Sequence, residues 1–222
     1  MKVLLCSEED QASQNMKREL LSDQQWPWSA PEAPLKGEDL LLIASTKDRS
    51  GDDVHLVQTP LRHLFVPEPD RRIARMFGKS AELIVVLSRH SSASGMRTLT
   101  VHHTGNFGKA EFGGEDTTLS VPAPAWTTQA LRLLKEEAAD AQDFTVCFEA
   151  THHGPTYTCP HFFIEIGSSI QEWTRQDLGR TIAATLRRLF TKPVPEDDPV
   201  LVGIGGGHYA PRHTDVALSK KA

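Results

Sequence analysis

The chain has 222 residues, 39% of them hydrophobic and 24% charged, which is typical of a globular domain with a core of its own. A formal net charge of −5 gives no overall attraction to nucleic acid. Three cysteines without CxxC spacing exclude a disulfide scaffold, and no apolar run reaches the ~20 residues of a membrane helix.

Strand-like and helix-like segments alternate along the chain. Apolar or alternating runs predict strands at 1–7, 39–45, 53–58, 81–88, 97–105, 144–150, 162–167 and 199–205. Stripes with helical spacing predict helices at 8–21, 127–141 and 170–190, the last with the capping-box residues Ser169 and Glu172. Prolines predict breaks at 26–34 and 66–70, and the tail 212–222 has no clear element.

This order of elements predicts a single α/β domain over residues 1–222. We expect three layers, α/β/α, around a mixed, largely parallel sheet. Acidic residues follow the first apolar run too closely for a signal peptide, so we expect a cytoplasmic protein.

Histidines recur at the ends of the predicted strands. Six of the ten lie at or just after a carboxyl end: His90, His102, His103, His152, His153 and His208. If the strands run parallel, these side chains meet at one edge of the sheet, where α/β proteins bind ligands. An antiparallel strand would take its histidine out of the cluster. The sequence leaves the strand directions open.

Clustered imidazoles are typical of a metal site. Neutral imidazole is the commonest protein ligand of zinc, and a catalytic zinc has three protein ligands and one open position. Glu149 or Glu165 fits a ligand, a partner of a liganding histidine, or a general base. Any one of these histidines is more simply a hydrogen-bonded loop residue, so only the recurrence of the pattern favours a metal.

Other polar groups near these histidines have two interpretations each. The Gly205–Gly207 run fits a phosphate cradle of backbone N–H groups or a simple turn. Asn106 fits either a group that orients a substrate carbonyl or an Asx turn. The serines at 88–94 lack the GxSxG pattern of a nucleophile, and turn chemistry explains them.

Four blocks carry a specific resemblance: "LSRHSSASGMRTLTVHHTGNFG", "EATHHGPTYT", "FFIEIGSSIQEW" and "VGIGGGHYAPR". Between about Ser88 and Arg212, they resemble the archaeal and plant type of D-aminoacyl-tRNA deacylase. The resemblance implies hydrolysis of the ester between a D-amino acid and the terminal adenosine of tRNA, releasing both. It also implies zinc as cofactor, the aminoacylated 3′ end of tRNA as partner, and a fold similar to peptidyl-tRNA hydrolase. Relative to that family, the C-terminal segment is short.

The expected site combines this resemblance with the histidine pattern. Zinc-activated water is expected to attack the ester. The expected metal ligands are His90, His102, His152, His153 and His208, with His103 as a substitute. The expected catalytic residues are Glu149, Glu165, Thr104 and Asn106. The expected substrate contacts are Ser91, Ser94, Gly105, Thr156, Gly205, Gly206, Gly207 and Tyr209. We expect a monomeric catalytic domain with no membrane contact.

Three alternatives stay open. The ribose 2′-hydroxyl of the terminal adenosine could assist hydrolysis without a metal, with the protein only positioning the ester. The same histidines would serve a metal-dependent amidohydrolase or peptidase. The non-enzymatic alternative is a module that binds metal or tRNA without turnover.

Overall fold

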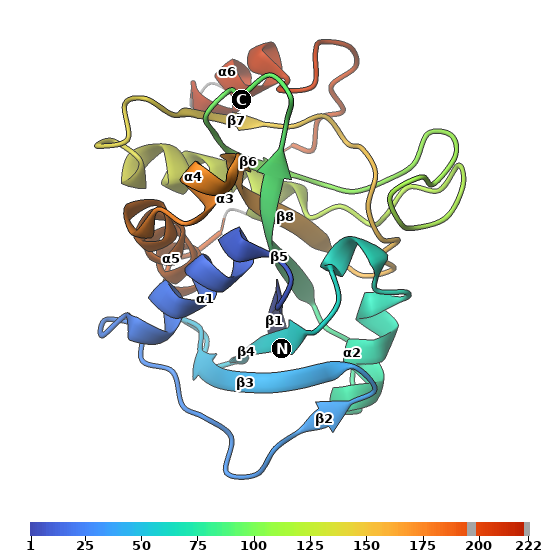
Figure 1. The fold of residues 1–222 in the computed structure, drawn as a ribbon, viewed down its shortest axis with the longest axis vertical. Coiled ribbons are helices and arrows are strands. Elements are labelled where there is room, and N and C mark those ends of the chain that lie inside the picture. The colour runs from blue at the N-terminus through green and yellow to red at the C-terminus, as the bar shows by residue number, and fades with distance from the viewer. Residues whose placement is uncertain (195–198, 220–222) are drawn as a thin grey trace.

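The computed structural model describes residues 1–194 and 199–219, which contain an eight-stranded mixed sheet (Figure 1). The strand order is β2-β3-β4-β1-β5-β8-β6-β7. The strands are β1 (Lys2–Ser7), β2 (Lys36–Gly37), β3 (Leu40–Lys47), β4 (Asp53–Thr59), β5 (Leu83–Ser91), β6 (Thr98–His102), β7 (Thr145–Phe148) and β8 (His161–Ser168). The helices are α1 (Gln11–Ser22), η1 (His63–Phe65, a 3-10 helix), α2 (Pro69–Phe77), α3 (Pro124–Glu137), α4 (Ile170–Trp173), α5 (Gln176–Thr191) and α6 (Pro211–Leu218). The predicted α/β class is confirmed.

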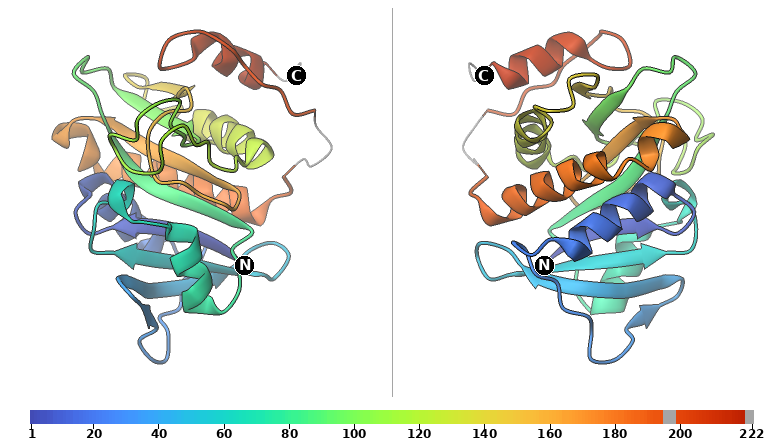
Figure 2. Two further views of the ribbon diagram at one scale, coloured as in Figure 1. Left: turned by 90° about the vertical axis from the view of Figure 1, so that its right-hand side faces the viewer. Right: turned by 60° about the vertical axis from the view of Figure 1, so that its left-hand side comes forward.

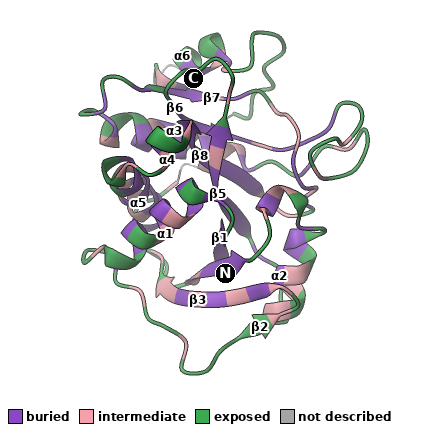
Figure 3. Ribbon diagram, viewed as in Figure 1, coloured by how far each residue is buried: buried purple, intermediate pink, exposed green. Residues whose placement is uncertain are grey.

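The two faces of the sheet are covered differently. The helices α1, α3 and α5 pack on one face, where Met16, Leu134 and Ile182 are fully buried in the larger core (Figure 2, right). The other face carries α2 against β2 and β3, and Ile73 of α2 joins a smaller core with Phe163 of β8. Above β8 on this face, loops rather than helices cover the sheet (Figure 2, left). The strands between the two cores are largely buried (Figure 3).

Two neighbouring strands reverse direction within the sheet. β8 pairs in parallel with β5 but antiparallel with β6, and β6 pairs in parallel with β7. The carboxyl ends of β5 and β6 therefore point towards opposite edges. The histidines that follow these two strands do not share an edge.

Two segments near the C-terminus differ from the sequence prediction. Residues 199–205 form no strand, and apolar side chains such as Ile204 remain exposed. A strand needs a neighbour with free backbone groups. The outermost strand β7 is instead contacted by α6, and the Phe148 amide donates to the Thr214 hydroxyl. This helix lies in the tail predicted to lack an element and begins at Pro211, a residue favoured at the first helical position.

The other helices also refine the prediction. The predicted helix at 170–190 is two helices, because α4 ends at Trp173 and α5 begins at Gln176. Ser169 and Glu172 form the predicted capping box of α4. The helix α2 begins at Pro69, inside a stretch predicted only as a break. In the described ranges, no helix combines the length and the apolar character that crossing a bilayer requires.

Candidate active site

Glu165 lies in the middle of the site, on β8, which is paired between β5 and β6. His102 of β6 pairs with Phe163, and His90 of β5 pairs with Gly167, two positions to either side of Glu165. Side chains two apart on a strand share a face, so both imidazoles flank this carboxylate. Its Oε2 lies 3.5 Å from His102 Nε2 and 3.7 Å from His90 Nδ1.

The expectation that an antiparallel strand removes its histidine is therefore wrong. The groups meet on a face of the sheet and not at its edge, so strand direction does not separate them.

Glu149 is the second carboxylate of the cluster and follows β7. Its side chain is fully buried, with Oε1 3.2 Å from His90 Nδ1. Its Oε2 lies 3.0 Å from His208 Nε2 and 3.6 Å from His152 Nε2. Among the described residues, neither oxygen has a hydrogen-bond partner, and neither does the buried His102 Nε2. Buried polar atoms without hydrogen bonds are costly unless a cation or a proton compensates them.

The cluster contains two possible metal-binding groups that share Glu149. They are His90–Glu149–His208 and His102–Glu149–His152, each with its ligand atoms within 4.8 Å of one another. In the second group, His102 Nδ1 donates to the His103 carbonyl at 3.1 Å, and His152 Nδ1 donates to the Ala150 carbonyl at 2.8 Å. Such outer hydrogen bonds fix the tautomer of a liganding histidine and aim its Nε2. Two aimed imidazoles and a buried carboxylate fit a metal that prefers nitrogen and oxygen ligands, such as zinc.

The carboxylates and imidazoles shift one another's pKa values. Burial disfavours a charged His102, but Glu165 and Glu149 outweigh it and raise its pKa to about 9. Burial and the nearby charge of His102 lower the pKa of His152 to about 3, so its imidazole is neutral at pH 7. Burial disfavours an ionised Glu165, yet His102 outweighs it and holds the pKa below its usual range. Metal ions compete with protons for ring nitrogens, so a cation at this point would replace the His102 proton.

Tyr209 and Trp173 fix the position of His90. A hydrogen bond of 3.0 Å joins the Tyr209 hydroxyl to His90 Nε2. The Trp173 indole donates to the His90 carbonyl at 2.9 Å. Tyr209, predicted to contact the substrate, thus contacts His90, a predicted metal ligand. Trp173 of α4 supports His90 and was not predicted from the sequence.

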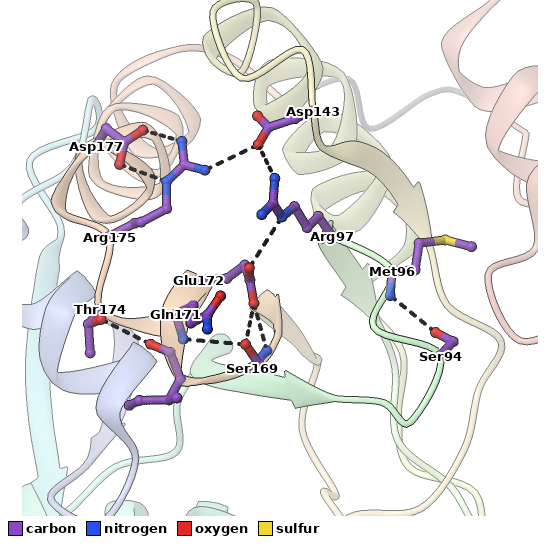
Figure 4. Close-up of polar contacts among 11 residues, drawn as sticks. Ser94, Met96, Arg97, Asp143, Ser169, Gln171, Glu172, Thr174, Arg175 and Asp177 are labelled. Carbon is purple, nitrogen blue, oxygen red and sulfur yellow. Dashed lines mark hydrogen bonds and ion pairs between the residues drawn. The ribbon is translucent and has the colours of Figure 1, made fainter.

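An ion-pair network anchors α4 (Figure 4). Arg97, just before β6, contacts Glu172 of the capping box at 3.3 Å and Asp143 at 2.8 Å. Asp143 also contacts Arg175 at 3.3 Å, and Arg175 contacts Asp177 at 2.7 Å. The network joins the start of β6, the start of α5 and the turn before β7, which stabilises the helix that holds His90.

Two predicted histidines lie outside both metal-binding groups. The ring of His153 lies 4.8 Å from that of Phe112, on the loop side of the cluster. His103 follows His102 and points to the opposite face, because consecutive strand residues alternate. Its Nε2 accepts from the Ala123 amide at 3.2 Å and contacts the Thr127 hydroxyl at 2.7 Å.

Thr104 and Asn106 are buried and hold the surrounding loops. The Thr104 hydroxyl donates to the Pro155 carbonyl at 2.8 Å and lies 2.9 Å from His161 Nε2. The Asn106 amide group donates to the Gly113 carbonyl at 3.1 Å. In the structure these residues contact the loops and belong to neither metal-binding group.

Of the remaining predicted substrate contacts, Ser91 is the last residue of β5 and the others lie on loops. Ser91, Ser94 and Gly205–Gly207 are exposed, and Ser94 accepts from a loop amide at 3.3 Å (Figure 4). Gly105 and Thr156 each make a hydrogen bond between loops, at 2.8 and 3.1 Å. Two of the predicted substrate residues form hydrogen bonds with members of the metal-binding groups. Tyr209 contacts His90, and the Gly105 amide donates to the His152 carbonyl.

Sequence reasoning missed a pocket beside the cluster. It has a volume of about 280 Å³, and Phe107, Phe112, His152 and His153 are among its lining residues. The signal was present in "GNFGKAEFGGED", because large apolar side chains in a glycine-rich loop rarely serve the core.

Comparisons with known proteins identify the family of this chain. The family model described as D-aminoacyl-tRNA deacylase matches residues 77–222. The D-aminoacyl-tRNA deacylase of Thermococcus kodakarensis is 38% identical over 98% of this chain and 76% of its own length. That of Pyrococcus furiosus is 36% identical over the same shares. A crystal structure described as a conserved protein of unknown function has a TM-score of 0.84 at 32% identity, covering 98% of this chain and 72% of its own. The chain belongs to the D-aminoacyl-tRNA deacylase family of ester hydrolases.

Proposed function

We propose that this chain hydrolyses the ester between a D-amino acid and the terminal adenosine of tRNA, with the cluster around Glu149 as its reactive site. The observation that carries the proposal is a buried carboxylate whose oxygens lie 3.0–3.6 Å from three imidazole nitrogens. Burying such charges costs stability, so clusters of this kind mark functional sites. Family membership supplies the substrate class.

Zinc is the proposed cofactor. His102, Glu149 and His152 would hold it, and His90 and His208 form the second possible group with the same Glu149. Bound zinc supplies a Lewis acid for the ester carbonyl and lowers the pKa of bound water to ~7. The donor set supports this choice, since three protein ligands leave a position open for chemistry.

Glu165 is the proposed proton acceptor. His102 holds the pKa of Glu165 below the usual range, and a cation in place of the His102 proton would keep a positive charge beside this carboxylate, so it stays ionised at neutral pH. Water adding to the ester carbonyl passes a proton to this carboxylate. His208 has 42% of its side chain exposed and meets the substrate at the open side of the cluster. The backbone amides of Gly205–Gly207, which precede His208 in the chain, are the proposed donors to the developing oxyanion.

Recognition is proposed to centre on the aminoacylated 3′ end. Phosphate contacts usually supply much of the affinity for nucleic acid, yet the net charge is −5. The arginines of α2 are paired internally, Arg72 with Asp39 at 2.6 Å and Arg75 with Glu38 at 2.7 Å. Every proposed group comes from one chain, so we propose one catalytic domain over residues 1–222. We also propose that it acts as a monomer in the cytoplasm, where tRNA is charged.

The test compares D-tyrosyl-tRNA with L-tyrosyl-tRNA on the zinc-loaded protein. We expect rapid loss of the D ester while the L ester is spared, with activity lost on chelation and restored by zinc. Full activity after exhaustive chelation would favour the 2′-hydroxyl mechanism. Cleavage of peptides without ester hydrolysis would favour the amidohydrolase, and tight binding without turnover the binding module.

A further inference from the structure

The pocket beside the cluster has walls that the reaction chemistry does not explain. It lies between the loop from Gly105 to Phe112 and the segment from Thr151 to His153. Two of its walls are rings with large exposed areas, since Phe107 is 75% exposed and Phe112 is 48% exposed. Exposed phenylalanines at the mouth of a pocket are typical of a recognition surface.

The loop that carries these rings is tightly held. The Asn106 side chain donates to the carbonyls of Gly113 and Glu115, at 3.1 and 3.2 Å. Gly113 has a φ of +86°, and a Cβ there would lie 1.9 Å from the Leu64 carbonyl oxygen. The loop therefore packs against its neighbours by backbone contact, which leaves the pocket already formed.

The pocket opens directly onto the reactive groups. His152 lines it and also belongs to the His102–Glu149–His152 group. The ring of His153 lies 4.5 Å from that of His152 and 4.8 Å from that of Phe112. These three rings connect the cluster to the exposed aromatic wall. A group held in the pocket therefore lies close to an ester bond placed at the cluster.

We propose that this pocket binds the adenine base of the terminal nucleoside, stacked on Phe107, the more exposed of the two rings; this rests on the proposed function. A volume of about 280 Å³ is near the lower limit for ligand pockets and suits one flat group rather than a whole aminoacyl nucleoside. Bases stack on aromatic side chains whatever the rest of the ligand.

The charged residues at the pocket favour the adenine base, and not the amino-acid side chain, as the group that binds there. Glu111 lines it and can accept from the exocyclic amine of adenine, while Lys109 can pair with the adjoining phosphate. The adenosine is common to every substrate of the family, whereas the amino acid varies. A rigid pocket with fixed aromatic walls matches the invariant part.

The first experiment uses Phe107→Leu, which keeps apolar bulk but removes the ring. D-tyrosyl-adenosine ester and D-tyrosine methyl ester are compared on wild type and variant. We expect the ratio of kcat/KM for the adenosine ester to that for the methyl ester to fall about tenfold, through KM. Phe65→Leu is the matched control, because Phe65 is 49% exposed but does not line the pocket. An unchanged ratio overturns the proposal. If kcat/KM falls equally for both esters, and falls further for D-amino acids with larger side chains, the pocket binds the amino-acid side chain instead.

A binding measurement separates this proposal from the proposed function. AMP is titrated into wild type and Phe107→Leu by calorimetry. Binding that weakens about tenfold in the variant supports the pocket even if no ester is hydrolysed. Equal binding by both proteins, or none by wild type, overturns the pocket while leaving deacylation to be judged on its own.

Discussion

Glu149 is the residue on which the site depends most. Its carboxylate is completely buried and lies between His90, His152 and His208. A hydrophobic residue of similar volume would be cheaper to bury, so the charge is explained by what it binds. Glu165 has two imidazole neighbours within 4 Å, His102 and His90, and belongs to neither metal-binding group.

Glu149→Gln keeps the shape of the side chain and removes its charge. We expect zinc content per chain to fall well below that of wild type and kcat/KM to fall by ~100-fold or more, because the neutral amide is a poor metal ligand. Metal content is measured by atomic emission after zinc loading and dialysis. The rate of hydrolysis is measured with D-tyrosyl-tRNA as substrate. Glu32→Gln, in an exposed loop, is the control. Full zinc content and rate in Glu149→Gln would move the reactive site elsewhere.

At the scale of residues, the sequence pattern predicts which histidines lie together better than it predicts how their side chains are oriented. Histidines after apolar runs are enough to anticipate that His90, His102, His152 and His208 lie near a glutamate. The same pattern cannot separate His102 from His103, because which of two consecutive side chains faces the site depends on the pairing of β6 with β8. The role of each residue remains a prediction.

Among the elements, the turn after β7 is the most constrained part of the site. Gly154 follows the paired histidines with a φ of +143°, and a Cβ there would lie 2.5 Å from Thr104 Cγ2. Thr104 is itself fixed by Pro155 and His161. The turn therefore cannot move aside to admit a methyl group without displacing a buried hydrogen-bond network.

Gly154→Ala tests this constraint. We expect Tm to fall by about 4–10 °C and activity to fall further than stability alone explains, because His152 is carried on the displaced segment. Gly51→Ala is the matched control: its φ is +83°, but nothing lies within 4 Å of the new Cβ. It bears the backbone strain without the clash. If the two variants have equal activity at a temperature where both are folded, the turn does not position His152.

Elements were predicted well where their own residues decide the outcome. The strand at 81–88 contains the apolar run Leu83–Leu87, the strand at 162–167 is interrupted only by Glu165 and Gly167, and Ala12, Met16 and Leu20 of α1 form a buried helical stripe. The predictions failed where the secondary structure of a segment depends on contacts with residues distant in the sequence. Residues 199–205 have the composition of a strand, but they pair with no strand among the described residues. The helix α6 contacts the outermost strand β7 instead.

For the molecule as a whole, the charges are distributed as internal pairs. Lys2 at the start of β1 contacts Asp48 at 2.6 Å, with both side chains over 90% buried. Asp48 also accepts from the amides of Ser50 and Asp52. Burial opposes ionisation of Asp48, but these partners outweigh it and lower its pKa. Its contribution to stability is therefore present above pH 3.8 and is lost as the pH falls further.

The comparison of wild type with Asp48→Asn measures this contribution. We expect the variant to have a Tm lower by about 5 °C at pH 7, with the gap closing as the pH drops below 3.8. Thermal unfolding followed by circular dichroism across pH provides the measurement. In the control Asp53→Asn, the broken pair with Lys47 is exposed, so the gap at pH 7 is much smaller. A gap that is constant down to pH 2 would mean that packing, and not charge, is what Asp48 contributes.

His90, His102 and Glu165 project from three adjacent strands of the sheet. Their separations are set by a hydrogen-bonded ladder whose strands lie ~4.8 Å apart, and hardly at all by the surrounding loops. Loops can lengthen, shorten or exchange residues over evolutionary time without moving these groups. The sheet therefore sets the positions of these three groups, whereas Glu149, His152 and His208 come from segments outside the strands and depend on the loops for their positions.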